Sequence, residues 1–233
     1  MREPDATVAR EPLNRARVLK AALGIIDAEG VEALSMRRLG AELGVDPMAV
    51  YRHVDGKDAV LDGVAELLWE ELPDACPEDG DWAASLRAFA SAIRSLFHAH
   101  PHAAPLMLQR LVLPVPQLEK SHQQLEALQA AGFDREDAAE ILRTLISFST
   151  GYGLAEVTCY ALVDGEAWPP PGSERDLLIA FAQFLPPGTP ARLVDVAIAL
   201  WAMADSDATF ESSIDLILSG ARLRLERRRG ASE

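Results

Sequence analysis

Apolar residues recur at spacings of three and four along nearly the whole chain of 233 residues, and no stretch alternates apolar and polar positions as a β-strand would. A spacing of three and four places side chains on one face of an α-helix. The pattern therefore predicts an all-α fold. No apolar run approaches the roughly 18 residues that a membrane-spanning helix needs, so no membrane partner is expected.

Capping residues mark the helix boundaries in the first part of the chain. Glycine commonly ends helices, serine and aspartate begin them, and proline is tolerated in a first turn. The predicted order is a first helix that ends at Gly30, a second capped by Ser35 and closed by Gly44, a third begun by Asp46 and Pro47, and a fourth from Lys57 to Glu71.

Turn-forming residues at 73–81 separate this part from a second helical part. The expected domains are a tail at 1–12, which lacks the pattern of a signal peptide, a first domain at 13–60, a connecting helix and linker at 61–80, and a large domain at 81–233. In the large domain, helices are predicted at 82–98, 117–131, 134–163, 174–185, 190–204 and 206–229, with a loop at 164–173.

Net charge is distributed unevenly between the two parts. The full chain carries −14, which disfavours a non-specific binder of nucleic acid. Residues 1–60 hold nine Lys and Arg against ten Asp and Glu, whereas residues 61–233 hold thirteen against twenty-six. The acidity belongs to the larger part, so we expect the two parts to have different partners.

The sequence predicts two short helices after a longer one, with a Gly-Val turn at 44–45 between the short helices. This is the spacing of a helix-turn-helix, whose second short helix lies in the major groove of DNA. An unspecialised corner of a helical bundle has the same spacing. The polar residues favour DNA binding: Tyr51 and His53 can donate to phosphate oxygens, and Lys57 begins the next helix. Arg37 can contact phosphate or guanine. Each residue alone is more often a solvated side chain, but together they form a coherent set.

The third helix has an inward and an outward side. Val50 and Val54, at positions i and i+4, are expected to point into the protein. The neighbours left for the groove side are Pro47, Met48, Ala49, Tyr51 and Arg52.

Residues 13–64 resemble, without a gap, the DNA-binding domain of TetR-family transcriptional repressors. The matching residues are Glu29-Gly30, Leu34-Ser35-Met36-Arg37, Leu43-Gly44-Val45, Val50-Tyr51-Arg52-His53 and Lys57. The resemblance implies a recognition helix at about 46–54 and DNA contacts at Arg37, Pro47, Met48, Ala49, Tyr51, His53 and Lys57. Because Pro47, Met48 and Ala49 offer few hydrogen bonds to bases, base choice would depend on Arg37, on thymine methyl groups and on DNA shape.

The large part resembles, more weakly, the tetracycline-repressor branch of that family. The resemblance lies in Leu125–Phe133, Gly151-Tyr152-Gly153 and Phe210–Gly220. In that branch two helices of each subunit, here 136–162 and 206–229, form a four-helix dimer interface. The apolar residues that would need partners are Leu142, Leu145, Ile146, Leu216 and Ile217. The alternative is that they are buried within one chain.

A pocket between helices is the usual small-molecule site of such a bundle. The candidates for its lining are Trp82, Phe89, Phe97, Met107, Arg143, Phe148 and Tyr152. Each of them is individually more often a core residue. Arg143 is the most informative, because a charge on an apolar helix face requires an anionic partner.

A metal or other cofactor is not expected. His98, His100 and His102 are closely spaced, but Pro101 interrupts the helix that would align them as ligands. The tetracycline repressors hold magnesium–tetracycline partly through a histidine in the following short helix, where this chain has Leu108-Gln109-Arg110. The resemblance therefore does not extend to tetracycline.

The chain shows no glycine-rich phosphate loop, nucleophile elbow or His-Glu-x-x-His motif. Two cysteines, Cys76 and Cys159, are too few for a disulfide framework and lack zinc-ligand spacing, which favours the cytoplasm. Taken with the resemblance, these features indicate a homodimeric repressor without enzyme activity, bound to an inverted repeat in double-stranded DNA and released by a small-molecule effector. The alternatives are a DNA-binding regulator without a ligand and a non-enzymatic helical adaptor.

Overall fold

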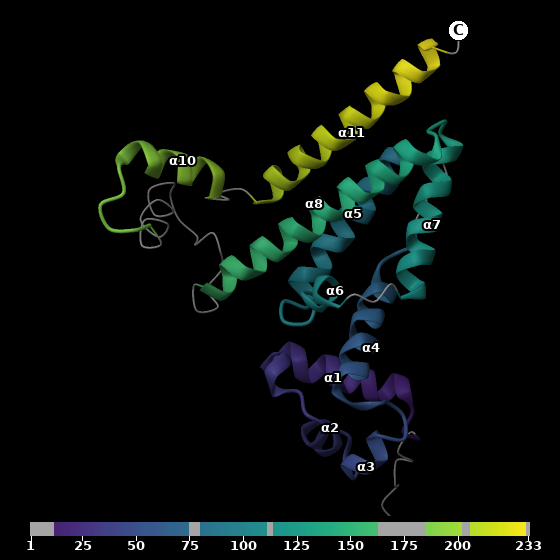
Figure 1. The fold of residues 1–233 in the computed structure, drawn as a ribbon, viewed down its shortest axis with the longest axis vertical. Helices are drawn as coiled ribbons and strands as arrows, with labels where there is room; N and C mark the ends of the chain where they lie inside the picture. The colour runs from purple at the N-terminus through teal and green to yellow at the C-terminus, as the bar shows by residue number, and fades with distance from the viewer. Residues whose placement is uncertain (1–11, 75–79, 111–113, 163–184, 202–205, 232–233) are drawn as a thin grey trace, which may run out of the picture. The chain divides into compact units, whose positions relative to one another are not determined.

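The computed structural model describes residues 12–74, 80–110, 114–162, 185–201 and 206–231 (Figure 1). Every element within these ranges is helical, as predicted. The chain divides into two compact units: unit 1 comprises Met1–Glu71 and His102–Val115, and unit 2 comprises Leu72–Pro101 and Pro116–Glu233. The helix predicted at 174–185, the loop at 164–173 and Cys76 lie outside the described residues.

The described residues of unit 1 form six helical elements. They are α1 (Arg15–Glu29), a 3-10 turn (Val31–Ala33), α2 (Met36–Leu43), α3 (Pro47–Val50), α4 (Gly56–Glu71) and α6 (Leu106–Gln109). Helix α1 packs on α2 and α4, α2 packs on α3, and α4 packs on α6. Their apolar stripes form one core, which includes Val18, Ile26, Leu39, Val50, Val60, Val64 and Leu68.

The predicted caps of unit 1 are confirmed. Ser35 accepts a hydrogen bond from the N–H of Arg38, Asp46 accepts one from the N–H of Met48, and Gly44 ends α2 in the left-handed conformation at φ +67°. The third helix is shorter than the prediction of 46–54, because the chain passes into turns at Tyr51–His53. The unit also extends beyond the predicted domain of 13–60, since α4 and the segment His102–Val115 belong to it.

Unit 2 contains five described helices. They are α5 (Trp82–Ala99), α7 (Val115–Ala130, of which the first residue is counted with unit 1), α8 (Arg135–Leu162), α10 (Ala191–Trp201) and α11 (Ser206–Ala231). Helix α5 lies along α8, and α11 contacts both (Figure 1). The core between these three helices includes Leu86, Phe89, Ile93, Phe97, Leu145, Phe210, Ile214 and Leu218.

The long helices predicted in unit 2 begin and end close to where the sequence places them. Asp81 caps α5 by accepting from the N–H groups of Ala83 and Ala84, and Asp134 caps α8 by accepting from the N–H of Asp137 over 2.8 Å. In the part of the chain that the structure describes, no helix is long and apolar enough to cross a membrane.

Candidate functional site

The turn between α2 and α3 brings the two short helices of unit 1 into close contact. A Cβ atom on Gly40 would lie 3.0 Å from the carbonyl oxygen of Val45 and 3.1 Å from the nitrogen of Pro47, so any larger residue would push the backbone of the turn away from α2. The N–H of Val45 also donates to the carbonyl of Gly40 over 2.9 Å. The geometry is that of a helix-turn-helix, with α3 and the turns after it in the position of the recognition element.

Burial along the recognition element follows the predicted inward and outward sides. Val50 and Val54 are buried, whereas Met48 is 67% exposed and Tyr51 is 46% exposed. The exposed Arg52 follows directly. Pro47, Ala49 and His53 are half-buried, so of the DNA contacts expected from the resemblance, Met48 and Tyr51 are the ones that project furthest here.

Adjacent arginines at the start of α2 have different surroundings. Arg38 donates to Glu29 at the end of α1 and to Glu42 one turn ahead, each over 2.7 Å, and these hydrogen bonds raise the pKa of its guanidinium. Arg37 is exposed, and no ion pair involves it among the described residues. Arg38 therefore ties α2 to α1, while Arg37 makes no ion pair among the described residues and faces solvent.

Lys57 is positioned by the turn between α1 and α2. Its ammonium group donates to the carbonyl oxygen of Val31 over 3.3 Å, and the residue is half-buried. The side chain thus extends from the first turn of α4 toward the start of the helix-turn-helix. An ammonium group has three donor hydrogens, so this bond leaves two for other acceptors.

The seven pocket candidates are distributed over both units. Six of them are in unit 2, whereas the buried Met107 belongs to unit 1. Phe89 and Phe97 are buried in the core, and Trp82 stacks edge-on against Phe133 at 5.1 Å between ring centroids. Arg143 is exposed on α8, so the anionic partner expected for a charge on an apolar face is not required there.

Three aromatic rings do meet where α8 approaches the start of α11. The centroids of Phe148 and Tyr152, both pocket candidates, lie 5.5 Å apart, and each is within 5.6 Å of the ring of Phe210. The guanidinium carbon of Arg94, from α5, lies 4.9 Å from the centroid of the Phe210 ring. This distance is suited to a cation–π contact.

Arg94 and Glu156 form the charged centre of this region, and sequence analysis missed both. The guanidinium of Arg94 donates from two nitrogens to the Glu156 carboxylate over 2.8 and 2.6 Å, and Glu156 is 3% exposed. These hydrogen bonds raise the pKa of Arg94. His98 also contacts Glu156, over 2.9 Å. A charge on an apolar helix face was expected to require an anionic partner at Arg143. Arg94 is the arginine that has such a partner, in Glu156.

A second buried polar group lies between α5 and α7. Ser85 donates to the side-chain oxygen of Gln124 over 3.2 Å, and Gln124 is 1% exposed. The amide nitrogen of Gln124 has no acceptor among the described residues, and the hydroxyl of Ser149 is likewise buried without a partner there. Buried donors without acceptors are uncommon and costly, so the amide of Gln124 is an unusual feature of this core.

Two of the three histidines considered as metal ligands have identified partners within the protein. His98 pairs with Glu156, and the Nδ1 atom of His102 lies 3.0 Å from the backbone oxygen of Asp27 in α1. Across the described ranges, no group of three or more His, Cys, Asp and Glu residues is arranged to hold a metal ion.

The apolar residues of α8 and α11 divide between the core and the surface. Leu142 and Leu145 are buried within the chain, as the intramolecular alternative expected, while Leu216 remains 74% exposed. Leu216 and Ile217 line an open groove of about 160 Å³ between the two helices, together with Ile141 and Thr144 of α8.

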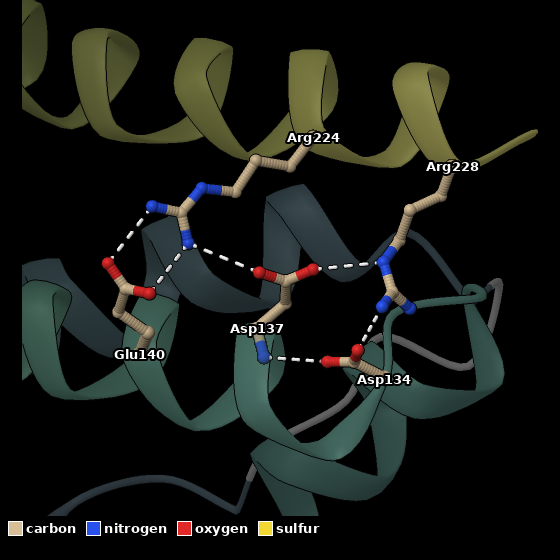
Figure 2. Close-up of polar contacts among 5 residues, drawn as sticks. All are labelled: Asp134, Asp137, Glu140, Arg224 and Arg228. Atoms are coloured by element: carbon tan, nitrogen blue, oxygen red, sulfur yellow. Dashed lines mark hydrogen bonds and ion pairs between the residues drawn. The ribbon is translucent and has the colours of Figure 1, made fainter. Parts of the chain in front are cut away.

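Ion pairs hold α11 on α8 at one end of this groove (Figure 2). Arg224 contacts Glu140 and Asp137, and Arg228 contacts Asp137 and Asp134. The hydrogen bonds from Arg224 lower the pKa of Glu140, and the N–H of Asp137 lowers the pKa of Asp134. We refer to these five residues as the α8–α11 ion-pair cluster.

Comparison with known families matches both parts of the chain. Residues 18–64 match the model described as bacterial regulatory proteins of the tetR family, and residues 73–225 match the model described as the tetracyclin repressor-like C-terminal domain. Together these matches span the helix-turn-helix and most of unit 2.

Individual relatives cover nearly the full length. The chain is 31% identical over 210 residues to the tetracycline repressor protein class A from transposon 1721 of Escherichia coli, covering 89% of each chain. It is 32% identical over 212 residues to the class C tetracycline repressor of the same organism, covering 89% of this chain and 90% of the relative. The crystal structure of the Streptomyces coelicolor protein ActR with actinorhodin has a TM-score of 0.73 and 29% identity, covering 92% of this chain and 99% of ActR.

Proposed function

Since the chain belongs to the TetR family of bacterial DNA-binding transcription regulators, we propose that it is a homodimeric repressor released from a palindromic operator by a small-molecule effector. The observation that carries the proposal is the intact helix-turn-helix: both caps, the close crossing at Gly40 and an exposed recognition element with Arg37 beside it. The named relatives are transcriptional repressors, which supports a cytoplasmic regulator that catalyses no reaction.

A second subunit is part of the proposal. Exposed Leu216 and Leu223 on α11, together with the groove beside α8, support pairing of these helices with those of another copy. A two-fold dimer requires an inverted repeat, because each recognition element then contacts one half-site, and successive half-sites lie roughly 34–36 Å apart.

The effector is proposed to bind in unit 2. The unsatisfied amide of Gln124 and the ring cluster at Phe148 support a ligand that has both a hydrogen-bond acceptor and apolar surface. The relative ActR was solved with actinorhodin, which makes that compound a suitable member of a first screen beside other antibiotics, aromatic acids and lipids. Tetracycline is not proposed, since the histidine of the tetracycline repressors is replaced here by the Leu108-Gln109-Arg110 segment.

The operator is tested by selecting duplexes from a random pool with the purified chain, and the dimer by light scattering at micromolar concentration. We expect a palindrome and twice the mass of one chain. A monomer, or a pool that yields no inverted repeat, contradicts this part of the proposal.

Release by effector is tested through linkage. A 100-fold loss of operator affinity corresponds to about 2.7 kcal/mol of coupling, and the operator must then weaken effector binding by the same factor. A compound found by thermal shift is titrated calorimetrically into the protein with and without saturating operator. The two titrations give the affinity of the compound for the operator-bound and for the free protein. Equal affinity of the compound in both titrations contradicts release by that compound, because its binding is then not coupled to the operator.

A further inference from the structure

The segment His102–Val115 lies with the DNA-binding unit, although the chain on both sides of it belongs to unit 2. Its apolar residues Ala103, Ala104 and Leu106 are buried, and α6 packs on α4. The ring of His102 contacts the backbone oxygen of Asp27 near the end of α1. A piece of chain remote in sequence from the helix-turn-helix is therefore built into the same compact unit.

Arg110, which follows α6 directly, connects this segment to the first two turns of α4. Its Nε atom donates to Asp62 over 2.6 Å, and its terminal nitrogens donate to the side chain of Asp58 over 3.2 Å and to the backbone oxygen of Asp58 over 3.3 Å. The side chain of Arg110 is only 24% exposed. The second terminal nitrogen also donates to the Asp58 carboxylate over 3.3 Å. Four hydrogen bonds from one planar group fix both its position and that of its partners.

The partners of Arg110 are part of an acidic row on α4. Asp58, Asp62 and Glu66 follow one another at intervals of four residues, so they lie on one face of the helix. Glu66 is paired with Arg15 of α1 over 2.8 Å, and Arg110 accounts for the other two. Asp58 directly follows Lys57, the residue expected to contact the DNA backbone. Without Arg110, Asp58 and Asp62 would have no cation paired with them, and they lie beside Lys57 on α4.

We propose that Arg110 is a positioning residue for DNA binding: it fixes the start of α4, and so Lys57, and its single positive charge partly cancels the two negative charges of Asp58 and Asp62 beside Lys57. The inference rests on the proposed function, because it concerns affinity for the operator. It differs from the contacts implied by the family resemblance, all of which lie between Arg37 and Lys57.

The test measures operator affinity by fluorescence anisotropy on the full chain, with the duplex selected by the unmodified protein. Arg110→Ala is expected to weaken binding about 10-fold, and more at low salt than at high salt, because like charges at short range are screened by ions. Arg110→Lys is expected to recover part of the loss. Gln109→Ala, an exposed neighbour on α6, is the matched control and should bind like the unmodified chain.

A rescue experiment separates positioning and charge cancellation from general damage to the fold. In the Asp58→Asn, Asp62→Asn background, Arg110→Ala is expected to cost less than threefold in affinity, because the carboxylates that it pairs with are gone. A 10-fold loss in both backgrounds, or affinity within twofold of the unmodified chain in the Arg110→Ala variant, overturns the inference. If the unmodified chain selects no duplex at all, the proposed function fails and the inference with it; if only the variants behave unexpectedly, the proposed function stands.

Discussion

Arg224 of α11 donates from two guanidinium nitrogens to the two carboxylate oxygens of Glu140 of α8, each over 2.9 Å (Figure 2). A paired fork of this kind fixes the relative rotation of the two side chains as well as their separation. It lies at the N-terminal end of α8 and in the C-terminal half of α11, the two helices proposed to meet a second subunit. The α8–α11 ion-pair cluster thus fixes the orientation of α11 on α8 within one chain.

Acid is expected to weaken this attachment. The pKa of Glu140 is lowered in the folded protein by the hydrogen bonds from Arg224, so its contribution to stability is complete above the pKa of an unfolded glutamate, about 4.3, and is lost as the pH falls through the lower folded value. Lowering the pH from 5 to 3 should reduce the urea concentration at the unfolding midpoint. This reduction should be smaller in Glu140→Gln than in the unmodified chain. Glu119→Gln, an exposed carboxylate of α7, is the control. If the urea midpoint depends on pH identically in Glu140→Gln and in the unmodified chain, the ion pair of Arg224 with Glu140 adds no pH-dependent stability.

Lys57→Ala should weaken binding to operator DNA and binding to non-specific DNA about equally. A lysine that neutralises one phosphate releases counterions but carries no base information, so its loss should also reduce the salt slope of binding by about one unit. Lys20→Ala, which removes an exposed lysine of α1, is the matched control for net charge. If both variants lose the same affinity, the effect is one of net charge and the contact is absent.

Arg37 and Arg38 provide a comparison between neighbours of the same type. Arg37→Ala is expected to lose roughly 1–3 kcal/mol of operator affinity, and to relax base preference at one position, if its guanidinium binds guanine. Arg38→Ala removes the ion pairs with Glu29 and Glu42 and should lower the unfolding temperature slightly with little change of base preference. Binding of each variant to the operator and to a scrambled duplex checks both. Equal losses of Arg37→Ala on the two duplexes would identify a phosphate contact instead.

The elements that the sequence predicts well are those set by residues close together in the chain. Ser35, Asp46 and Gly44 cap their helices through bonds to residues two to four positions away, so the residue type and its place in the pattern are sufficient. The inward positions of Val50 and Val54 follow from the helical period in the same way. The early end of α3 was not predicted, because the turns after it keep the same burial as a helix would.

Pairings between distant segments could not be predicted in this way. Arg94 and Glu156 are separated by 62 positions, and nothing in the local pattern distinguishes Arg94 from Arg143, which is exposed. The location of His102–Val115 in unit 1 depends on packing of α6 against α4, which is again non-local. The residues within the helix-turn-helix were therefore accessible to sequence analysis, whereas the polar centre of unit 2 required the structure.

Glu156→Gln should destabilise unit 2 more than any exposed carboxylate. Removing one partner of a buried pair leaves Arg94 without its main counter-charge, and such changes cost roughly 3–5 kcal/mol of unfolding free energy. Glu211→Gln is the control, because Glu211 is 49% exposed and its pair with Arg87 should contribute about 1 kcal/mol or less. Urea unfolding at pH 7 measures the difference. Comparable losses in the two variants would contradict the assignment of Glu156 as the charged centre.

Removing the buried polar pair of Ser85 and Gln124 should preserve or raise the stability of the protein but weaken effector binding. The amide nitrogen of Gln124 lacks an acceptor in the described residues, so replacing both partners by apolar residues, in Ser85→Ala with Gln124→Leu, removes an unsatisfied donor and should leave the unfolding temperature unchanged or higher. The same variant should lose about 10-fold in affinity for an effector that accepts a hydrogen bond from Gln124, a change of about 1.4 kcal/mol.

Thermal unfolding with and without a compound from the screen measures both quantities at once. Ser147→Ala, an exposed position of α8, controls for the loss of a hydroxyl. An effector that stabilises the double variant as much as the unmodified chain would exclude Gln124 from its binding site. A fall in unfolding temperature without the compound would instead show that the amide is satisfied in the free protein. The polar pair would then be part of the core of unit 2, and the donor proposed for the effector would have to be found elsewhere in that unit.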